Sequence, residues 1–234
     1  YMFDRIWGRV EKVESNLRNK FGKSIDTPWQ RLLSIVHFYL MDHALLRILW
    51  TNFYQFGPKA YRSNQPSPRR LKKYKKLGIR TVMNLRGSPT QAHYLFEKEA
   101  CEKLGLTLIN CSITARAFTP KKYFIELFDY FDEIEKPFVV HCKSGADRAS
   151  LVAAFYLIHV HGYSVKETRP QFSIKYLHLK FTRTGLLDSL MDTYEREGEA
   201  KGITLRDWIV NHYDANFLTK EFFLGKNRVL NLII

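Results

Sequence analysis

Cysteine is scarce in this sequence: Cys101, Cys111 and Cys142 are the only three among 234 residues. An odd number of cysteines without framework spacing excludes a disulfide scaffold and favours a reducing compartment. No zinc-ligand spacing is present either. The sequence therefore predicts no metal ion and no other cofactor.

A long uncharged apolar run is also missing. Residues 32–50 form the most apolar stretch near the start, yet they include four charged or titratable side chains: His37, Asp42, His43 and Arg47. A membrane-spanning helix needs about 20 largely uncharged apolar residues, which excludes a span here. The residues shown start at Tyr1 without a secretory signal. We therefore expect a location in the cytoplasm or at the periphery of a membrane.

Acidic residues are outnumbered: 23 Asp and Glu face 37 Lys and Arg, giving a formal net charge of +14. This excess favours polyanionic partners, namely phosphoproteins, phosphorylated lipids or sugars, an acidic membrane surface, or nucleic acid. Nucleic acid is the weakest of these, because the sequence contains no recognised nucleic-acid-binding module.

Apolar residues are plentiful, at 45% hydrophobic and 15% aromatic, which excludes disorder over most of the chain. Phe56, Gly57 and Pro58 break the apolar pattern that precedes them. We expect three parts: an N-terminal helical extension over residues 1–56, a central domain over residues 57–198, and a C-terminal helical tail packed on that domain over residues 199–234.

Strand patterns alternate with helix patterns in the central domain. Strands are expected over residues 60–62, 79–85, 107–113 and 137–142. The expected N-caps of the intervening helices are Ser67, Ser88 and Thr119, each followed by proline. This order predicts an α/β fold with a mostly parallel central sheet and helices on both faces. Ligands of such sheets bind at the carboxyl ends of the strands.

Residues 137–148 organise the chain. A short apolar run ends in His141 and Cys142. A short turn of small residues follows, and the apolar run 149–160 comes next. This order predicts a strand, a tight loop and a buried helix. Backbone N–H groups of the loop and of the first helical turn can converge on one anion, such as a phosphate. The same field favours the thiolate form of Cys142, and Arg148 can donate two N–H groups to phosphoryl oxygens.

The spacing Cys-x5-Arg, led by His and containing Gly145, resembles the signature of the cysteine-dependent phosphatases, the protein tyrosine and dual-specificity phosphatase superfamily. Three phrases are similar to a bacterial branch of it: YRSNQP at 61–66, TVMNLRG at 81–87 and HCKSGADR at 141–148. The likeness covers residues 58–195, which makes the central domain phosphatase-like. The competing interpretation is a structural cysteine beside a helix-capping arginine, which leaves the order of strand, turn and helix unexplained.

The resemblance implies a phosphomonoesterase in which Cys142 is the nucleophile, Arg148 holds the phosphoryl oxygens and a cysteinyl-phosphate forms. Further residues are expected to bind substrate: Lys143, Ser144, Gly145, Ala146, His141, Arg86 and Arg116. His141 is expected to hydrogen-bond near Cys142 or the loop backbone, with a purely structural role as the alternative. The substrate is expected to be a phosphotyrosine-type protein or an anionic phosphorylated lipid or sugar, and Lys143 favours one with more than one phosphate.

The chain departs from the resembled family in its proton donor. The family places an aspartate on a loop that corresponds to residues 110–120, and this loop contains no Asp or Glu and only Arg116 as a charge. Asp147, just before Arg148, is the candidate donor, because its place is similar to that in myotubularin-type and Sac-type lipid phosphatases. The alternatives for Asp147 are an orienting hydrogen bond to loop amides or an ion pair with a neighbouring arginine.

A second departure is Ala149, where the family commonly has a hydroxyl that helps the thiolate leave during hydrolysis of the intermediate. Ser150 stands one place late. We therefore expect slow breakdown of the phospho-enzyme. The alternative function is a phosphate-binding adaptor with little or no turnover.

Other segments have two interpretations each. Residues 32–56, with Ile35, Tyr39, Leu46, Leu49 and Phe53 as inward positions, are expected to form a helix that packs on the domain or lies in a membrane interface. The basic residues of 69–76 form a solvated face or a docking face for an acidic membrane or substrate.

Residues 171–183 are expected to form a solvated helix face or a basic wall near the phosphate site. Their charged or titratable residues are Lys175, His178, Lys180 and Arg183. Cys111 is a spectator or forms a regulatory disulfide with Cys142.

Overall fold

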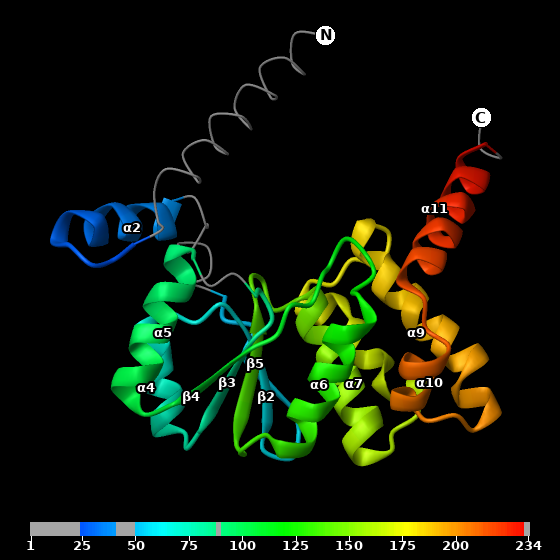
Figure 1. Ribbon diagram of the computed structural model, residues 1–234, viewed down its shortest axis with the longest axis horizontal. Helices are drawn as coiled ribbons and strands as arrows, with labels where there is room; N and C mark the ends of the chain where they lie inside the picture. The colour runs from blue at the N-terminus through cyan, green and yellow to red at the C-terminus, as the bar shows by residue number, and fades with distance from the viewer. Residues whose placement is uncertain (1–23, 41–49, 88–89, 232–234) are drawn as a thin grey trace, which may run out of the picture.

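The computed structural model describes residues 24–40, 50–87 and 90–231 (Figure 1). A five-stranded sheet lies at its centre, in the order β1-β2-β5-β3-β4. Its strands are β1 (Tyr54–Gly57), β2 (Ala60–Asn64), β3 (Thr81–Asn84), β4 (Thr107–Asn110) and β5 (Phe138–Cys142). All neighbouring pairs are parallel except the edge pair β1 and β2. The expected α/β class with a mostly parallel sheet is confirmed.

Helices cover both faces of the sheet, as Figure 1 shows: α4 (Pro68–Lys76) and α5 (Ala92–Leu104) lie on one face, α6 (Lys121–Glu133) and α7 (Asp147–His161) on the other. Side chains alternate between the faces along each strand. Val82 and Val139 therefore join the core beneath α4 and α5, whereas Met83 and Val140 join the larger core beneath α6 and α7. Both faces of β3 and β5 are buried, which explains the consecutive apolar residues at 82–83 and 138–140.

Helix α7 is the centre of the larger core. Its residues 149–158 are all buried, as expected of a helix that is apolar all round. The Phe155 ring lies 5.1 Å from that of Phe124 and 5.9 Å from that of Phe128, both on α6. The helix ends at Gly162, which adopts φ +68°.

Helices also follow the sheet domain along the chain. They are α8 (Val165–Thr168), α9 (Leu186–Glu197), α10 (Leu205–Asn211) and α11 (Ala215–Asn231). A capping box of Ser164 and Glu167 opens α8, and Thr204 caps α10. After α10, Tyr213 packs its ring 5.5 Å from Phe124 and donates its hydroxyl to the Thr119 carbonyl at 2.7 Å.

The N-terminal expectation is partly wrong. Helix α2 (Pro28–Leu40) begins the described structure, but the chain after it does not stay helical to residue 56, because Tyr54–Gly57 pairs with β2. Ile35 is 38% exposed instead of inward. Phe53 does lie inward, stacked on the rings of Tyr61 and Tyr74. The side chains of the other inward positions lie outside the described residues: Tyr39, Leu46 and Leu49.

Two of the expected N-caps, Ser88 and Thr119, are wrong as well. Helix α5 begins after Gln91, which makes no side-chain cap bond, and residues 88–89 lie outside the described residues. Helix α6 begins after Pro120. The Thr119 hydroxyl instead accepts the Thr114 N–H at 3.0 Å, so it closes the preceding loop.

Residues 171–183 do not form the expected helix. They fold as short 3₁₀ turns, including η1 (Arg169–Phe172) and η2 (Ile174–Tyr176). Leu177 takes φ 59° after η2, which directs His178 into the protein, where it is 3% exposed. Throughout the described chain, no helix is both long enough and apolar enough to cross a membrane.

Replacing Phe155 with alanine removes the ring that joins α7 to α6. We expect Phe155→Ala to lower the free energy of unfolding by about 3–5 kcal/mol, measured by urea denaturation, because the cavity cannot collapse between two helices. Phe181→Ala is the control: its ring is 82% exposed, so the change should stay within about 0.5 kcal/mol. Similar small losses for both variants would contradict the packing.

Candidate active site

Cys142 is the last residue of β5, at the carboxyl edge of the sheet, and is 2% exposed. Residues 143–146 form a tight loop, and α7 begins at Asp147. The Gly145 N–H donates to the Cys142 sulfur, with nitrogen and sulfur 3.2 Å apart. The sulfur thus lies at the start of the loop with a backbone donor directed at it.

Gly145 brings the loop against β2. Its φ is +73°, and a Cβ at this position would lie 2.7 Å from backbone atoms of Ser63 and Asn64. Only glycine fits both the left-handed conformation and the close approach. The Gln65 N–H donates to the Lys143 carbonyl at 3.3 Å, which fixes the loop to the end of β2.

Asn52, before β1, supports the same loop from another side. It is 1% exposed and has φ 49°. Its Nδ2 donates to the Ser144 carbonyl at 3.2 Å and to the Tyr176 carbonyl at 3.1 Å. The Ser144 hydroxyl faces the loop itself and accepts the Ala146 N–H at 3.3 Å.

Arg62, inside β2, braces the loop from behind, and sequence reasoning missed it. It is 0% exposed, and its Nη2 donates to the carbonyls of Gly145 at 2.7 Å and Ala146 at 3.1 Å. Since C=O and N–H point in opposite directions across a trans peptide, the N–H groups of Ala146 and Asp147 point away from Arg62. Burial lowers the pKa of Arg62 to about 10, with Tyr176, Cys142 and Asp147 acting in the opposite direction, so the guanidinium stays charged at neutral pH. The signal in the sequence was a charged residue inside the strand expected over residues 60–62.

A pocket of about 940 Å³ opens beside the loop. Four cationic residues line it: Arg86, Arg116, Lys143 and Arg148. Ser144, in the loop, is also part of the lining, and Asp147 is its one acidic residue. Arg148 Nη1 donates to the Leu85 carbonyl at 3.3 Å, which holds this side chain against the end of β3. The sequence-predicted residues Arg86, Arg116, Lys143, Ser144, Asp147 and Arg148 thus meet at one cavity, and it suits an anion.

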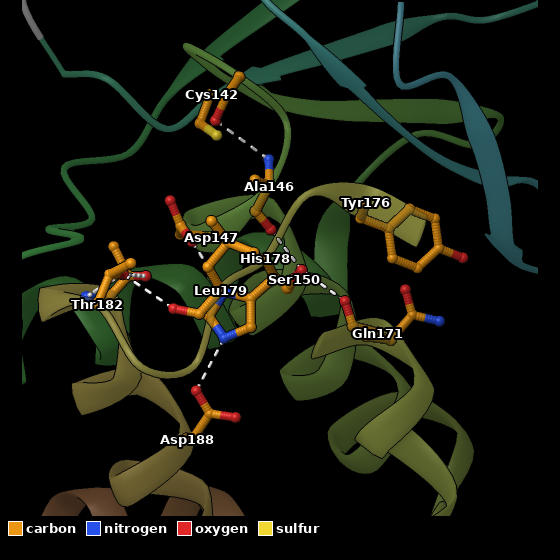
Figure 2. Close-up of polar contacts among 12 residues, drawn as sticks. Cys142, Ala146, Asp147, Ser150, Gln171, Tyr176, His178, Leu179, Thr182 and Asp188 are labelled. Carbon is orange, nitrogen blue, oxygen red and sulfur yellow. Dashed lines mark hydrogen bonds and ion pairs between the residues drawn. The ribbon is translucent and has the colours of Figure 1, made fainter. Parts of the chain in front are cut away.

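Asp147 binds a histidine, not the loop amides or arginine that its two alternatives required. Its Oδ1 lies 2.8 Å from His178 Nδ1, and His178 Nε2 lies 2.8 Å from Asp188 Oδ2 on α9 (Figure 2). Burial alone would lower the pKa of His178, but the bonds to Asp147 and Asp188 outweigh it and raise the pKa to about 9. The sequence placed His178 on a solvated helix face or in a basic wall near the phosphate site, and it did not reveal these two partners, which lie 31 and 10 residues away.

A family model described as the Swiss Army Knife protein, DSP-PTPase phosphatase domain, matches residues 60–193. The chain belongs to this family. It is a phosphatase of the protein tyrosine and dual-specificity type. A search of curated proteins found no match.

Solved structures share the fold of this phosphatase. TpbA of P. aeruginosa is 20% identical over 69% of this chain and 92% of its own, with a TM-score of 0.50. A TpbA variant in complex with pTyr is 19% identical over 69% of this chain and 91% of its own, also at 0.50. The core catalytic domain of the PP-IP phosphatase SIW14 from S. cerevisiae is 13% identical over 58% of this chain and 83% of its own, at 0.48.

His141 of this phosphatase does not face Cys142 or the loop, so that expectation is wrong. Alternation along β5 places its side chain on the opposite face of the sheet. There its Nε2 lies 2.6 Å from Glu97 Oε1, with both side chains 0% exposed. Gln65 Nε2 donates to Glu97 Oε2 and Arg86 Nη1 donates to Gln65 Oε1, each at 3.0 Å. The buried pair is therefore linked to a cation of the pocket.

Ser150 and Cys111 do not take part in the phosphatase pocket. The Ser150 hydroxyl donates to the Gln171 carbonyl at 2.6 Å and accepts from Arg62 at 2.7 Å, so it belongs to the brace behind the loop.

Cys111 is a buried free thiol. Burial and the nearby Glu126 raise the pKa of this thiol to about 12. It follows β4, which β3 separates from β5. Two strand spacings amount to about 10 Å, too far for the regulatory disulfide with Cys142.

Gly145 provides a test of the loop geometry. We expect Gly145→Ala to lower phosphatase activity about 10²-fold, because the Cβ displaces the loop from β2 and misplaces its amides. Gly162→Ala is the matched control, since Gly162 has a similar φ of +68° but no atom within 4 Å of its Cβ position. It should lose only about 1–2 kcal/mol of stability and keep its kcat. Equal activity in the two variants would contradict the loop placement.

Proposed function

We propose that this phosphatase is a metal-independent phosphomonoesterase that acts through a cysteinyl-phosphate on Cys142. The observation that carries the proposal is the sulfur of Cys142, which accepts the Gly145 N–H at 3.2 Å at the start of a loop whose neighbours Lys143, Ser144 and Arg148 line a cationic pocket. The loop amides and Arg148 hold the three equatorial phosphoryl oxygens. Lys143, Arg86 and Arg116 add positive charge around them.

The reaction proceeds in two steps. The Cys142 thiolate attacks phosphorus, so the S–P bond forms as the P–O bond to the leaving group breaks, and Asp147 gives the leaving oxygen its proton. Water then loses a proton to Asp147 and attacks phosphorus, so the O–P bond forms as the S–P bond breaks, which releases phosphate and restores the thiolate. Asp147 is supported as the donor by its place in the pocket lining and by the lack of acidic residues in residues 110–120.

The pocket supports an anionic substrate larger than phosphate alone. Arg86 and Arg116 reach it from the ends of other strands, beyond the loop that holds the reacting phosphoryl group. The pocket volume of about 940 Å³ leaves room for a second charged group near them. We propose a phosphotyrosine-type protein or an anionic phosphorylated lipid or sugar as substrate.

The nucleophile is tested with an aryl phosphate. We expect Cys142→Ser to lower the turnover of nitrophenyl phosphate by at least about 10⁴-fold, measured by release of nitrophenolate, because a serine hydroxyl here has no base to activate it. Cys111→Ala is the control and should keep its activity. Wild-type protein that binds a phospho-ligand without any turnover would instead support the phosphate-binding adaptor, which Ala149 and the engaged Ser150 hydroxyl favour.

The missing hydroxyl at position 149 predicts a kinetic burst. Rapid mixing of wild-type enzyme with nitrophenyl phosphate should release about one nitrophenolate per active site before slower steady turnover, because the phospho-enzyme breaks down slowly. Ala149→Ser should speed the slow phase roughly 2–10-fold, the worth of one hydrogen bond. A linear onset in the wild type would show that the intermediate does not accumulate.

A further inference from the structure

Three side chains from separate segments form a row that leads from the pocket into the protein (Figure 2). Asp147 opens α7, His178 follows the turn η2, and Asp188 lies in the first turn of α9. The imidazole of His178 is 0% exposed, and each of its nitrogens lies 2.8 Å from a carboxylate oxygen.

This geometry fits a charged imidazole between two ionised carboxylates. Neutral histidine has one N–H donor, whereas imidazolium has two, and an ionised carboxylate only accepts. From α7 the group facing His178 is Asp147, from α9 it is Asp188, and from η1 it is the uncharged ring of Phe172, 5.3 Å away. These two carboxylates raise the pKa of His178 to about 9 against the effect of burial.

The two ends of the row differ. Asp147 has a 21% exposed side chain and lines the pocket, whereas Asp188 is 6% exposed and does not line it. Only Asp147 can exchange a proton with a substrate. Replacing a buried ion pair with packed apolar side chains of similar size is often neutral or stabilising for the folded protein. A purely structural link between α7 and α9 therefore does not need these charges.

We infer that His178 stores the proton that Asp147 delivers to the leaving group, and that Asp188 is a positioning residue that keeps His178 protonated and oriented. The inference rests on the proposed function. In the first chemical step the proton on His178 Nδ1 passes to the Asp147 carboxylate and from that carboxyl group to the leaving oxygen. The imidazole is left neutral, with its Nε2–H toward Asp188. In the second step the attacking water loses a proton to Asp147, which returns it to His178 Nδ1, and the cycle closes.

The leaving group separates a proton role from a structural one. Phenolate needs a proton when it leaves, whereas nitrophenolate is stable without one. We expect His178→Gln and Asp188→Asn to lower kcat/KM for phenyl phosphate about 10²-fold, within the range of general acid catalysis, and for nitrophenyl phosphate only a few-fold. The ratio kcat/KM reports on the first chemical step even if breakdown of the intermediate limits kcat. Equal losses for both substrates would overturn the inference.

The pH profile gives a second readout. Wild-type kcat/KM for phenyl phosphate should fall at alkaline pH near 9, because the row must hold its proton. Asp188→Asn removes one of the two carboxylates that favour imidazolium, so the alkaline limb should move to lower pH by about one unit or more. Asp192→Asn is the matched control on the same helix: Asp192 pairs with Arg169 and is 49% exposed, and its profile should match the wild type. If the alkaline limb of the Asp188→Asn profile lies at the same pH as in the wild type, the inference that His178 stores the proton is refuted.

The proposed function and this inference fail differently. If Cys142 is not the nucleophile, Cys142→Ser keeps its nitrophenyl phosphate turnover whatever His178 does. If His178→Gln does not fold, as judged by circular dichroism, Asp188→Asn decides the question, because the substitution keeps the size of the side chain.

Discussion

The site depends on the hydrogen bonds that the buried guanidinium of Arg62 donates to the carbonyls of the loop. The loop after β5 must direct several peptide N–H groups to one side, and it can do so only if its carbonyls are satisfied on the other side. Arg62 binds two of these carbonyls and, through its second nitrogen, the side chain and carbonyl of Gln171. The ring of Tyr176 lies 3.9 Å from its guanidinium carbon. One cation thus joins β2, the loop and the turns after α8.

This brace explains why the two halves of the chain meet at the pocket. The sheet supplies the sulfur and the edge against which the loop packs, and the turns around residues 171–178 supply the groups that hold Arg62 and Asp147. Residues on the opposite face of the sheet also reach the pocket, through the contacts from Glu97 to Gln65 and Arg86. The site is therefore a product of both cores and of the irregular segment between α8 and α9.

Local patterns predicted most of the fold but not the contacts that set the chemistry. The strand, loop and helix around Cys142 were predictable, because apolar periodicity and glycine act over a few residues. Arg62 and the pairing of His178 were missed, since the partners lie far along the chain: Gln171 is 109 residues from Arg62 and Asp147 is 31 residues from His178. His141 was predicted to lie near Cys142 because the two are adjacent in the sequence, whereas successive residues of a strand face opposite sides of the sheet. The cap at Thr119 failed because its hydroxyl serves a loop contact that no local signal reveals.

Asn52 carries a consequence for where this enzyme can be cut. The family match starts at residue 60, yet Asn52 holds the Ser144 carbonyl, Thr51 accepts the Asn64 N–H at 2.9 Å, and Trp50 contributes to the pocket wall. A fragment trimmed to the family boundary would keep the nucleophile and lose three supports of its surroundings. The working unit of catalysis therefore begins at least ten residues before the family match does, and expression of a shorter piece would yield a loosened pocket on a sheet that lacks β1.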